Sequence, residues 1–152
     1  TSNYNVSLLF NYAPYQKEDA FKIYELCKDK DQIDIDIYED SIRGFIKLMN
    51  QCDLLIANEG GTVHITKALN KPTFTIYSPY IEKGDWNSFE DGHTHESIHL
   101  LDEKPNLFQE FTRESRKVIE ENPEALYREL TPEMILQKLE PFLEYHFNNA
   151  KK

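Results

Sequence analysis

The stretch 52–79, which reads CDLLIANEGGTVHITKALNKPTFTIYSP, constrains the fold of this chain more than any other part of it. It opens with the apolar run 53–57, which is typical of a strand covered on both faces in a parallel sheet. Two adjacent glycines, Gly60 and Gly61, then allow a tight turn from strand to helix that also lets a ligand approach the main chain. A second apolar strand is expected over 73–77. The stretch therefore predicts a β-turn-α-β unit.

A helix is expected to begin near Thr62 and to connect the two strands. One side of it is apolar and is formed by Val63, Ile65, Ala68 and Leu69. Asn70 suits a C-terminal cap, and the pair Lys71-Pro72 ends the helix before the second strand. The unpaired N–H groups of its first turn, with the positive end of its dipole, roughly half an elementary charge, meet the carboxyl end of the first strand. Phosphate groups bind at such helix termini.

Two polar side chains flank the glycines. Glu59 lies at the strand end, and His64 falls in the first helical turn, from which its side chain can reach a phosphate held on the glycines. The turn alone leaves another interpretation open, in which His64 is a surface or packing residue and no ligand binds. The residues themselves therefore indicate a candidate phosphate site without deciding its occupant.

The order strand, Asn, acidic residue, small residue, Gly, two variable residues, His and helix resembles the donor-site signature of the ADP-heptose:lipopolysaccharide heptosyltransferase family. In that signature an Asp is followed by Thr or Ser, Gly, two variable residues and His. The matching residues are Glu59, Gly60, Gly61 and His64, followed downstream by Ala68, Leu69, Lys71 and Pro72. The sequence departs from the signature at Glu59, which is one methylene longer than Asp, and at Gly60, which lacks a hydroxyl.

This resemblance covers residues 5–101 and implies the carboxyl-terminal, nucleotide-sugar-binding half of a GT-B glycosyltransferase acting in lipopolysaccharide core biosynthesis. The donor contacts that it implies are Glu59, Gly60, Gly61, Thr62 and His64, together with Lys17 and Glu39. The implied donor is ADP-heptose or another ADP-sugar, without cofactor or metal, and the implied acceptor is lipopolysaccharide or another glycan. The acceptor half, which carries the general base in this family, is expected to be absent from residues 1–152. We therefore expect the fragment to bind donor without transferring sugar.

Lys17 and Glu39 each have an equally simple alternative role. Lys17 follows the first expected strand, in the loop that carries a pyrophosphate-contacting Lys in the family, but it could equally be a solvated first-turn residue of the helix expected over 17–29. Glu39 ends the strand expected over 32–38, where a carboxylate commonly accepts hydrogen bonds from ribose hydroxyls. The alternative is that Glu39 and Asp40 favour the positive end of the helix that follows.

A long loop over 80–96 is expected to be functional, because compact domains rarely use such long segments as mere connections. The family has a Trp in this region and Trp86 is placed comparably, so the loop is expected to cover the donor. His93, His95 and His99 could share a metal, because histidines two apart on a strand or loop can face one ion. No partner Cys or suitably spaced acidic residue completes that set, and GT-B enzymes hold no catalytic metal on the protein, so we expect none.

The fold class expected from the whole chain is α/β, a Rossmann-like, mainly parallel sheet of four to five strands flanked by helices, within one domain. Its core is expected over 5–101. The further strands of this core are expected at 5–12, 32–38 and 97–101. A helix capped by Ser41 is expected to lead into the central stretch.

Helices are expected to follow the core over 105–149. One is expected over 106–121, and another begins with Thr131 as cap and Pro132 at its first position, with a kink at Pro141. The residues that it carries to the core are expected to be Met134, Ile135, Leu136, Leu139, Phe142 and Leu143. The residues expected to pack on the absent domain are Phe142, Tyr145 and Phe147.

Charge and cysteine content limit the partners and the compartment. The 17 basic and 27 acidic residues give a formal net charge of −10, which argues against nucleic acid or an anionic membrane surface as the main partner. No apolar run approaches the roughly 18 residues of a spanning helix. Cys27 and Cys52 have neither metal-site nor disulfide spacing and are expected to be buried small hydrophobes. We therefore expect a cytoplasmic protein, with any membrane association peripheral and through the full-length enzyme.

Two other functions stay open at this point. One is another GT-B nucleotide-sugar enzyme, such as a UDP-sugar epimerase, because a glycine turn alone does not fix the chemistry. The other is a non-catalytic interaction domain that keeps the fold. Preference for ADP would favour the transferase, preference for UDP the epimerase, and absence of nucleotide binding the interaction domain.

Overall fold

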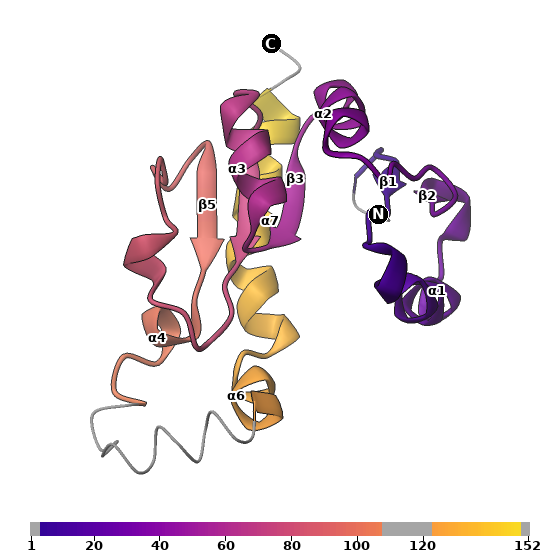
Figure 1. Ribbon diagram of the computed structural model, residues 1–152. Helices are drawn as coiled ribbons and strands as arrows, with labels where there is room; N and C mark the ends of the chain where they lie inside the picture. Colours follow the sequence, from indigo (N-terminus) through magenta and orange to yellow (C-terminus); the bar gives the residue numbers. More distant parts are fainter. Residues whose placement is uncertain (1–3, 108–122, 150–152) are drawn as a thin grey trace. The chain divides into compact units, whose positions relative to one another are not determined.

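The computed structural model describes residues 4–107 and 123–149. The chain divides into two compact units, 1–51 and 52–152. Both units contain strands and helices in alternation, as Figure 1 shows. The helix expected over 106–121 lies almost entirely outside the described residues.

The first unit contains two short parallel strands and two α-helices. Its elements are β1 (Leu8–Leu9), η1 (Pro14–Gln16), α1 (Lys17–Leu26), η2 (Lys30–Gln32), β2 (Ile33–Asp34) and α2 (Ile42–Gln51), where η denotes a 3₁₀ helix. β1 pairs with β2 in parallel. The strands expected over 5–12 and 32–38 are each reduced to two residues, because each has a single neighbour to hydrogen-bond. The helix expected over 17–29 ends at Leu26.

Helix α2 begins where the sequence predicts. The Ser41 Oγ atom accepts a hydrogen bond from the Gly44 N–H at 3.0 Å, and the Ser41 carbonyl accepts one from the Phe45 N–H at 2.8 Å. Ser41 therefore caps the helix, as expected. The buried side chains of the helix are those of Phe45 and Met49.

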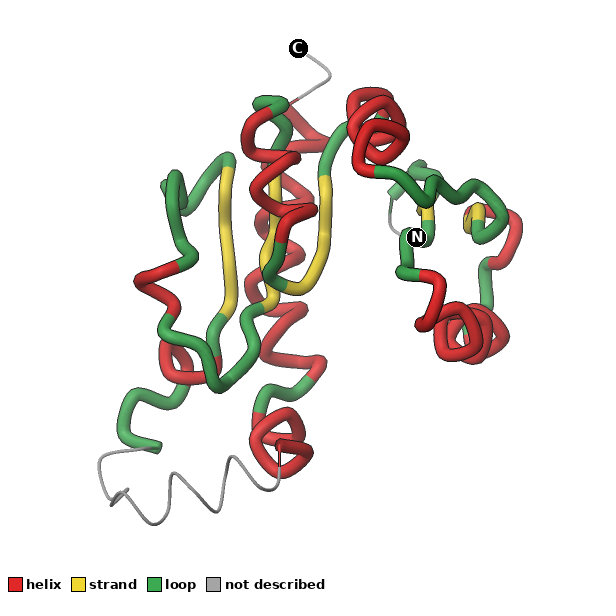
Figure 2. The backbone as a smooth tube through the Cα atoms, in the orientation of Figure 1, coloured by secondary structure: helices red, strands yellow, loops and turns green. Residues whose placement is uncertain are grey.

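The second unit is a three-stranded parallel sheet with helices on both faces. Its elements are β3 (Leu55–Asn58), α3 (Gly61–Ala68), β4 (Thr73–Ile76), η3 (Lys83–Asp85), β5 (His95–Ile98), α4 (Leu100–Glu103), α6 (Pro123–Glu129) and α7 (Pro132–Asn149). The strand order is β3-β4-β5, and Thr73 pairs with Leu55 on one side and with His95 on the other. Figure 2 shows the three strands side by side. This arrangement confirms the predicted β-turn-α-β unit, and the predicted α/β class with it.

The strands of the described residues form two sheets, one in each unit. Hydrogen bonds join β1 to β2, and separately join β3, β4 and β5. All of these pairings are parallel, as the sequence predicts for the fold class. The single sheet of four to five strands is thus represented by a two-stranded and a three-stranded sheet.

Helix α3 ends at a left-handed residue. Asn70 has φ 58°, a conformation that Asn adopts more readily than other residues with a side chain. Its N–H donates to the Lys67 carbonyl at 2.9 Å, and the Lys71 N–H donates to the Thr66 carbonyl at 3.2 Å. The last turn of the helix is therefore satisfied, and the predicted cap at Asn70 is confirmed.

The core of the second unit combines residues of β4, β5, α4, α6 and α7. Its buried members are Phe74, Ile98, Leu100, Leu126, Leu130 and Phe142. Figure 1 shows α3 on one face of the sheet and α7 on the other. The contact between β4 and α7 centres on Phe74 and Phe142, whose ring centroids are 5.6 Å apart.

Helix α7 begins as predicted, but its side chains differ from two expectations. The Thr131 Oγ1 atom accepts from the Met134 N–H at 3.4 Å, and the helix continues through Pro141. Leu136 was expected in the core and is 47% exposed. Phe142 is 5% exposed and belongs to the core of its own unit, so it is not available to pack on another domain.

Two elements after the loop also differ from the sequence predictions. β5 starts at His95 and ends at Ile98, whereas the strand was expected over 97–101, because α4 begins at Leu100. Helix α6 has no counterpart in the predictions, where Pro123 marks the end of a helix. In the structure Pro123 is the first residue of α6, a position that tolerates its missing N–H.

Two further expectations concern the burial of the cysteines and the presence of membrane-spanning helices. Cys27 and Cys52, expected to be buried, are only half-buried. Of the helices formed by residues 4–107 and 123–149, none combines the length and hydropathy that crossing a bilayer requires.

Replacing Phe142 by Ala should lower the free energy of unfolding by about 3 kcal/mol, because it removes a buried ring that packs on Phe74 and leaves a cavity. Urea unfolding followed by circular dichroism measures the change. Leu136→Ala in the same helix removes a side chain that is 47% exposed and should cost about 0.5 kcal/mol or less. Equal losses for the two variants would contradict this packing of α7.

Candidate functional site

The turn between β3 and α3 is built on Gly60. Its φ of 148° and ψ of −171° lie where residues with a side chain are strained. Gly60 is also the N-cap residue of α3, so no side chain caps the helix from this position. The Val63 and His64 N–H groups donate to the Gly60 carbonyl at 3.1 and 3.4 Å, so the N–H groups of Gly61 and Thr62 are the ones left for solvent or a ligand.

The space above the two glycines is open. A Cβ atom added to Gly60 or to Gly61 would meet no heavy atom of the described residues within 4 Å, apart from those of the adjoining residues and of the helix backbone itself. The first turn of α3 carries no acidic residue that would oppose an anion. The helix dipole and the free N–H groups therefore act together on whatever enters this space.

Glu59 ties together the ends of β3 and β4. Its Oε2 atom accepts a hydrogen bond from the Ser78 N–H at 2.9 Å, while its own N–H donates to the Ile76 carbonyl at 3.3 Å. Ser78 is held in turn by Tyr127, whose hydroxyl donates to the Ser78 Oγ atom at 3.0 Å. The carboxylate therefore fixes the shape of the sheet edge on which the glycine turn sits.

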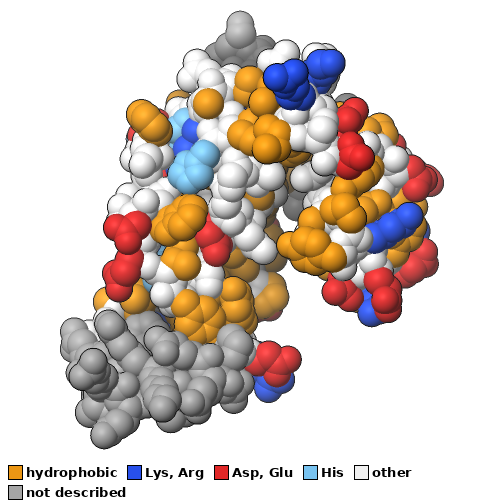
Figure 3. Space-filling model, viewed as in Figure 1, with side chains coloured by type: hydrophobic (Ala, Val, Ile, Leu, Met, Phe, Trp, Pro, Cys, Tyr) orange, Lys and Arg blue, Asp and Glu red, His pale blue; other side chains and the backbone are white. Residues whose placement is uncertain are grey.

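His64 meets the long loop that follows β4. Its ring lies 6.0 Å from the Trp86 ring, centroid to centroid, at 33° between the planes. Trp86 is 41% exposed, so one part of its indole faces solvent beside His64. Figure 3 shows histidine and hydrophobic side chains close together on the viewed face of the second unit. The loop thus reaches the helix turn that the sequence assigns to phosphate.

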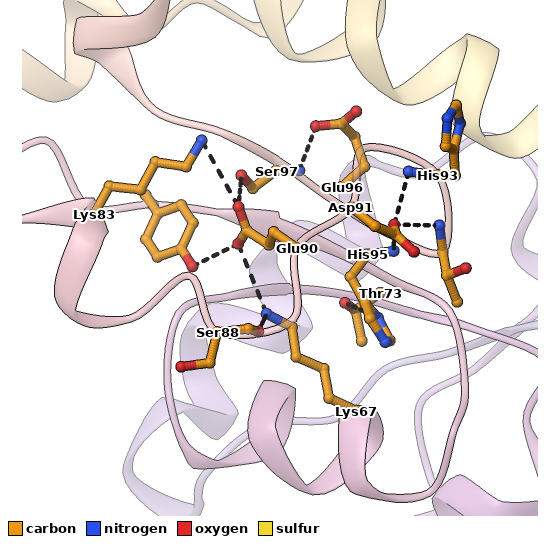
Figure 4. A network of polar contacts seen from close by, with 12 residues as sticks. Lys67, Thr73, Lys83, Ser88, Glu90, Asp91, His93, His95, Glu96 and Ser97 are labelled. Carbon is orange, nitrogen blue, oxygen red and sulfur yellow. Dashed lines mark hydrogen bonds and ion pairs between the residues drawn. The ribbon is translucent and has the colours of Figure 1, made fainter.

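The same loop is anchored by the carboxylate of Glu90, which is shown in Figure 4. Its Oε1 atom accepts from the Tyr77 hydroxyl at 2.6 Å, and its Oε2 atom accepts from the Ser97 hydroxyl at 2.7 Å. The ammonium groups of Lys67 and Lys83 each lie 3.7 Å from one of these oxygens. One carboxylate therefore connects the loop to β5, to α3 and to the residue that follows β4.

Burial changes the protonation of the groups around Glu90. Burial lowers the pKa of Lys67, while the charge of Glu90 acts in the opposite direction. Burial, followed by the hydrogen bond to Glu90, raises the pKa of Tyr77 well above its ordinary value. The Tyr77 hydroxyl therefore stays a proton donor to the carboxylate at all ordinary pH values.

Asp91 closes the loop just before β5. Its Oδ1 atom accepts hydrogen bonds from the N–H groups of His93, Thr94 and His95 at 2.9, 2.7 and 3.0 Å. These bonds, that from His95 foremost, hold the pKa of the Asp91 carboxyl well below its ordinary range. The adjacent Gly92 has φ 73°, which completes the tight turn into the strand.

The three histidines considered as metal ligands have separate places. The His95 Nδ1 atom lies 3.0 Å from the Thr73 Oγ1 atom, and burial, followed by the charge of Lys67, lowers the pKa of His95. The His99 Nδ1 atom accepts from the Leu101 N–H at 3.1 Å and caps α4. His93 is exposed, and its carbonyl oxygen lies 2.9 Å from the His146 Nε2 atom. Within residues 4–107 and 123–149, no three His, Cys, Asp or Glu side chains gather as a metal site would require.

The predicted donor contacts fall into both units. Glu59, Gly60, Gly61, Thr62 and His64 come together at the turn between β3 and α3. Lys17 and Glu39 belong to the first unit. Lys17 is the first residue of α1, with its ammonium 5.6 Å from the centre of the Phe21 ring. The Glu39 carboxylate lies against Gly44 in the first turn of α2.

Two residues that hold the loop, Lys67 and Glu90, were not predicted from the sequence. Lys67 resembles an ordinary solvated position of α3, and Glu90 resembles one of many acidic residues on a surface loop. The role of Asp91 could have been predicted, because an Asp-Gly dipeptide is typical of a tight turn in which the carboxylate accepts hydrogen bonds from nearby N–H groups.

Comparison with known proteins identifies one family. A model of glycosyltransferase family 9 (heptosyltransferase) matches residues 1–84, more than half of the 152 residues. The match includes Lys17, Glu39 and the whole glycine turn, and it ends just before Trp86. The family predicted from the donor-site residues is thereby confirmed. No curated protein and no solved structure gives a significant match.

Asp91→Asn should make the free energy of unfolding depend less steeply on pH under acidic conditions. The pKa of Asp91 is lower in the folded protein than the ordinary 3.8, so its stabilising bonds are intact above about pH 4 and are lost as the pH falls below it. Urea midpoints measured between about pH 6 and pH 3 should therefore fall less steeply in the variant than in the wild type. Asp85→Asn, an exposed position in the same loop, should follow the wild type; a matching effect there would contradict the assignment to Asp91.

Proposed function

The chain belongs to glycosyltransferase family 9 (heptosyltransferase), and on this premise we propose that it is the nucleotide-sugar-binding half of a heptosyltransferase-like enzyme of the GT-B fold. The proposed process is lipopolysaccharide core biosynthesis. The proposed donor is ADP-heptose or another ADP-sugar, and the proposed acceptor is lipopolysaccharide or another glycan. In this proposal the acceptor and the general base that activates its hydroxyl are held by a second half, outside residues 1–152.

The open glycine turn is the observation that carries the proposal. Gly60 and Gly61 leave space against the N-terminus of α3, and the N–H groups of that first turn have no side-chain cap. A diphosphate suits this space, because its oxygens accept several hydrogen bonds and its charge is favoured by the helix dipole. With a net charge of −10 on the whole chain, such local groups must supply the attraction for an anion.

The same groups have a role in the transfer step. As the acceptor oxygen bonds to the anomeric carbon, the bond from that carbon to the diphosphate breaks and negative charge builds on the leaving phosphate. Fixed N–H donors at the α3 terminus, with His64 beside them, would stabilise this charge without reorganising. Glu59 would contribute by holding the turn, since its carboxylate is bonded to the Ser78 N–H at 2.9 Å.

Thr62, Lys17 and Glu39 complete the proposed donor contacts. Thr62 lies in the first turn of α3, where its N–H belongs to the uncapped group. Lys17 is proposed to contact the pyrophosphate and Glu39 the ribose hydroxyls. Both lie within residues 1–84, the part of the chain that the family covers.

A calorimetric titration series with ADP, UDP, GDP and CMP tests the function most directly. Preference for ADP, with a dissociation constant between about micromolar and millimolar, is the expected result for a half-site lacking its opposite wall. Preference for UDP would favour a UDP-sugar enzyme instead. Absence of binding to all four nucleotides would favour a non-catalytic interaction domain and would refute the proposal.

Gly61→Val should abolish ADP binding and leave the fold intact. The new side chain would enter the space proposed for phosphate, and its Cβ atom would meet nothing within 4 Å apart from the adjoining residues and helix backbone, so we expect the helix to accommodate it. Circular dichroism checks the fold, and calorimetry checks the affinity. Ala68→Val adds a β-branched residue at the far end of the same helix and should bind ADP like the wild type. Normal ADP affinity in a folded Gly61→Val protein would remove the glycine turn from the site.

His64→Ala should weaken ADP binding by about tenfold, the loss expected for one hydrogen bond to a charged group. Adenosine affinity should change little, because adenosine lacks the phosphates that His64 is proposed to contact. The two titrations are compared on the same protein preparations. Equal losses for ADP and adenosine would place His64 elsewhere in the site.

A further inference from the structure

We propose that Glu90 and Lys67 are positioning residues, which fix the segment 83–90 so that Trp86 forms one wall of the donor site beside His64. The inference rests on the proposed function for the identity of the ligand. The structural part of the inference is that a buried ion pair determines the position of Trp86. It rests only on contacts within the second unit.

The segment runs along one face of α3. His64 and Lys67 are three residues apart in the helix, so their side chains share a face. The loop touches that face twice, through the Trp86 ring at 6.0 Å from His64 and through the Ser88 carbonyl, which accepts from the Lys67 ammonium at 2.8 Å. The second contact fixes the first, because only one residue, Asn87, separates Trp86 from Ser88.

The two ends of the segment meet at one carboxylate. The Lys83 ammonium lies 3.7 Å from the Glu90 Oε2 atom, and it also bonds to the Asp102 carboxylate at 2.6 Å. The Asn87 N–H donates to the Lys83 carbonyl at 3.0 Å within the same segment. Trp86 therefore lies near the tip of a short loop whose two ends, Lys83 and Glu90, are close together. These ends are attached to the sheet and to α4.

The ion pair between Glu90 and Lys67 is buried, so removing either partner alone is costly. The side chains of Glu90 and Lys67 are 11% and 3% exposed, and Glu90 also accepts hydrogen bonds from Tyr77 and Ser97. Removing the negative charge leaves the Lys67 ammonium buried without its counter-ion, which is costly. The ammonium must then move toward solvent, and it takes its bond to the Ser88 carbonyl with it. Trp86 loses the contact that holds it against His64.

Glu90→Gln tests the inference with Trp86 as a reporter, since the chain contains a single Trp. The amide keeps the size of the side chain and one acceptor oxygen but removes the charge. We expect red-shifted Trp86 emission and stronger quenching by acrylamide, with an unchanged circular dichroism spectrum. Lys67→Met, which removes the cation instead, should give the same spectral change. Glu82→Gln makes the same charge change at an exposed position of the loop and should match the wild type.

ADP titration of the same proteins measures the consequence for the site. Glu90→Gln and Lys67→Met should each weaken ADP binding by about fivefold, as expected for the loss of one hydrogen-bonded anchor. The two losses should not add in the double variant, because both act through one loop position. Unchanged Trp86 emission in folded Glu90→Gln and Lys67→Met proteins would overturn the inference, and so would altered emission with wild-type ADP affinity.

Failure of the proposed function would give a different pattern. In that case the wild-type protein would not bind ADP at all, whereas the emission comparison would still decide whether Glu90 and Lys67 position Trp86. If Glu90→Gln does not fold, Lys67→Met supplies the same two measurements. The emission of a folded variant therefore decides the structural step independently of any ligand.

Discussion

Parallel pairing of β3, β4 and β5 is the constraint on which the rest of the second unit depends. Because the strands run in one direction, their carboxyl ends lie at one edge of the sheet, and every connection to the next strand must start there. The glycine turn, Ser78 and the start of the long loop therefore share this edge. Glu59 fixes the relation between the first two, since its carboxylate accepts the Ser78 N–H. The glycine turn and Ser78 are therefore held in fixed positions at this edge, where the N-terminus of α3 is exposed.

A second constraint is the burial of charge beneath the long loop. The 18 residues between β4 and β5 (77–94) would have many conformations if they were held only by apolar contacts. Glu90 limits them, because its buried carboxylate requires its cations and hydroxyl donors at fixed places. Asp91 then closes the segment by accepting three N–H groups in a row. The loop is thus specified by polar satisfaction more than by hydrophobic packing, which places Trp86 beside His64.

The sequence predicts the local chemistry of the turn better than its tertiary support. Gly60, the caps at Ser41, Asn70 and Thr131, and the parallel strands around the turn follow from short-range rules for glycine, capping residues and apolar runs. The strands of the first unit are shorter than their apolar patterns suggest, because pairing partners limit a strand more than its own residues do. Glu90 and Lys67 could not be predicted, since their partners lie up to 23 positions away in the chain and depend on how the loop folds back. Phe142 shows the same limit, because an apolar helix face does not indicate which surface covers it.

The central claim is that the turn between β3 and α3 binds the diphosphate of a nucleotide sugar. The most direct measurement is a titration of isotope-labelled protein with ADP, followed by the amide resonances in nuclear magnetic resonance spectra. The account predicts that the N–H signals of Gly60, Gly61 and Thr62 shift first and most, with the Trp86 indole signal moving at the same ADP concentrations. Saturable shifts confined to other parts of the chain, or none at these three amides, would contradict it.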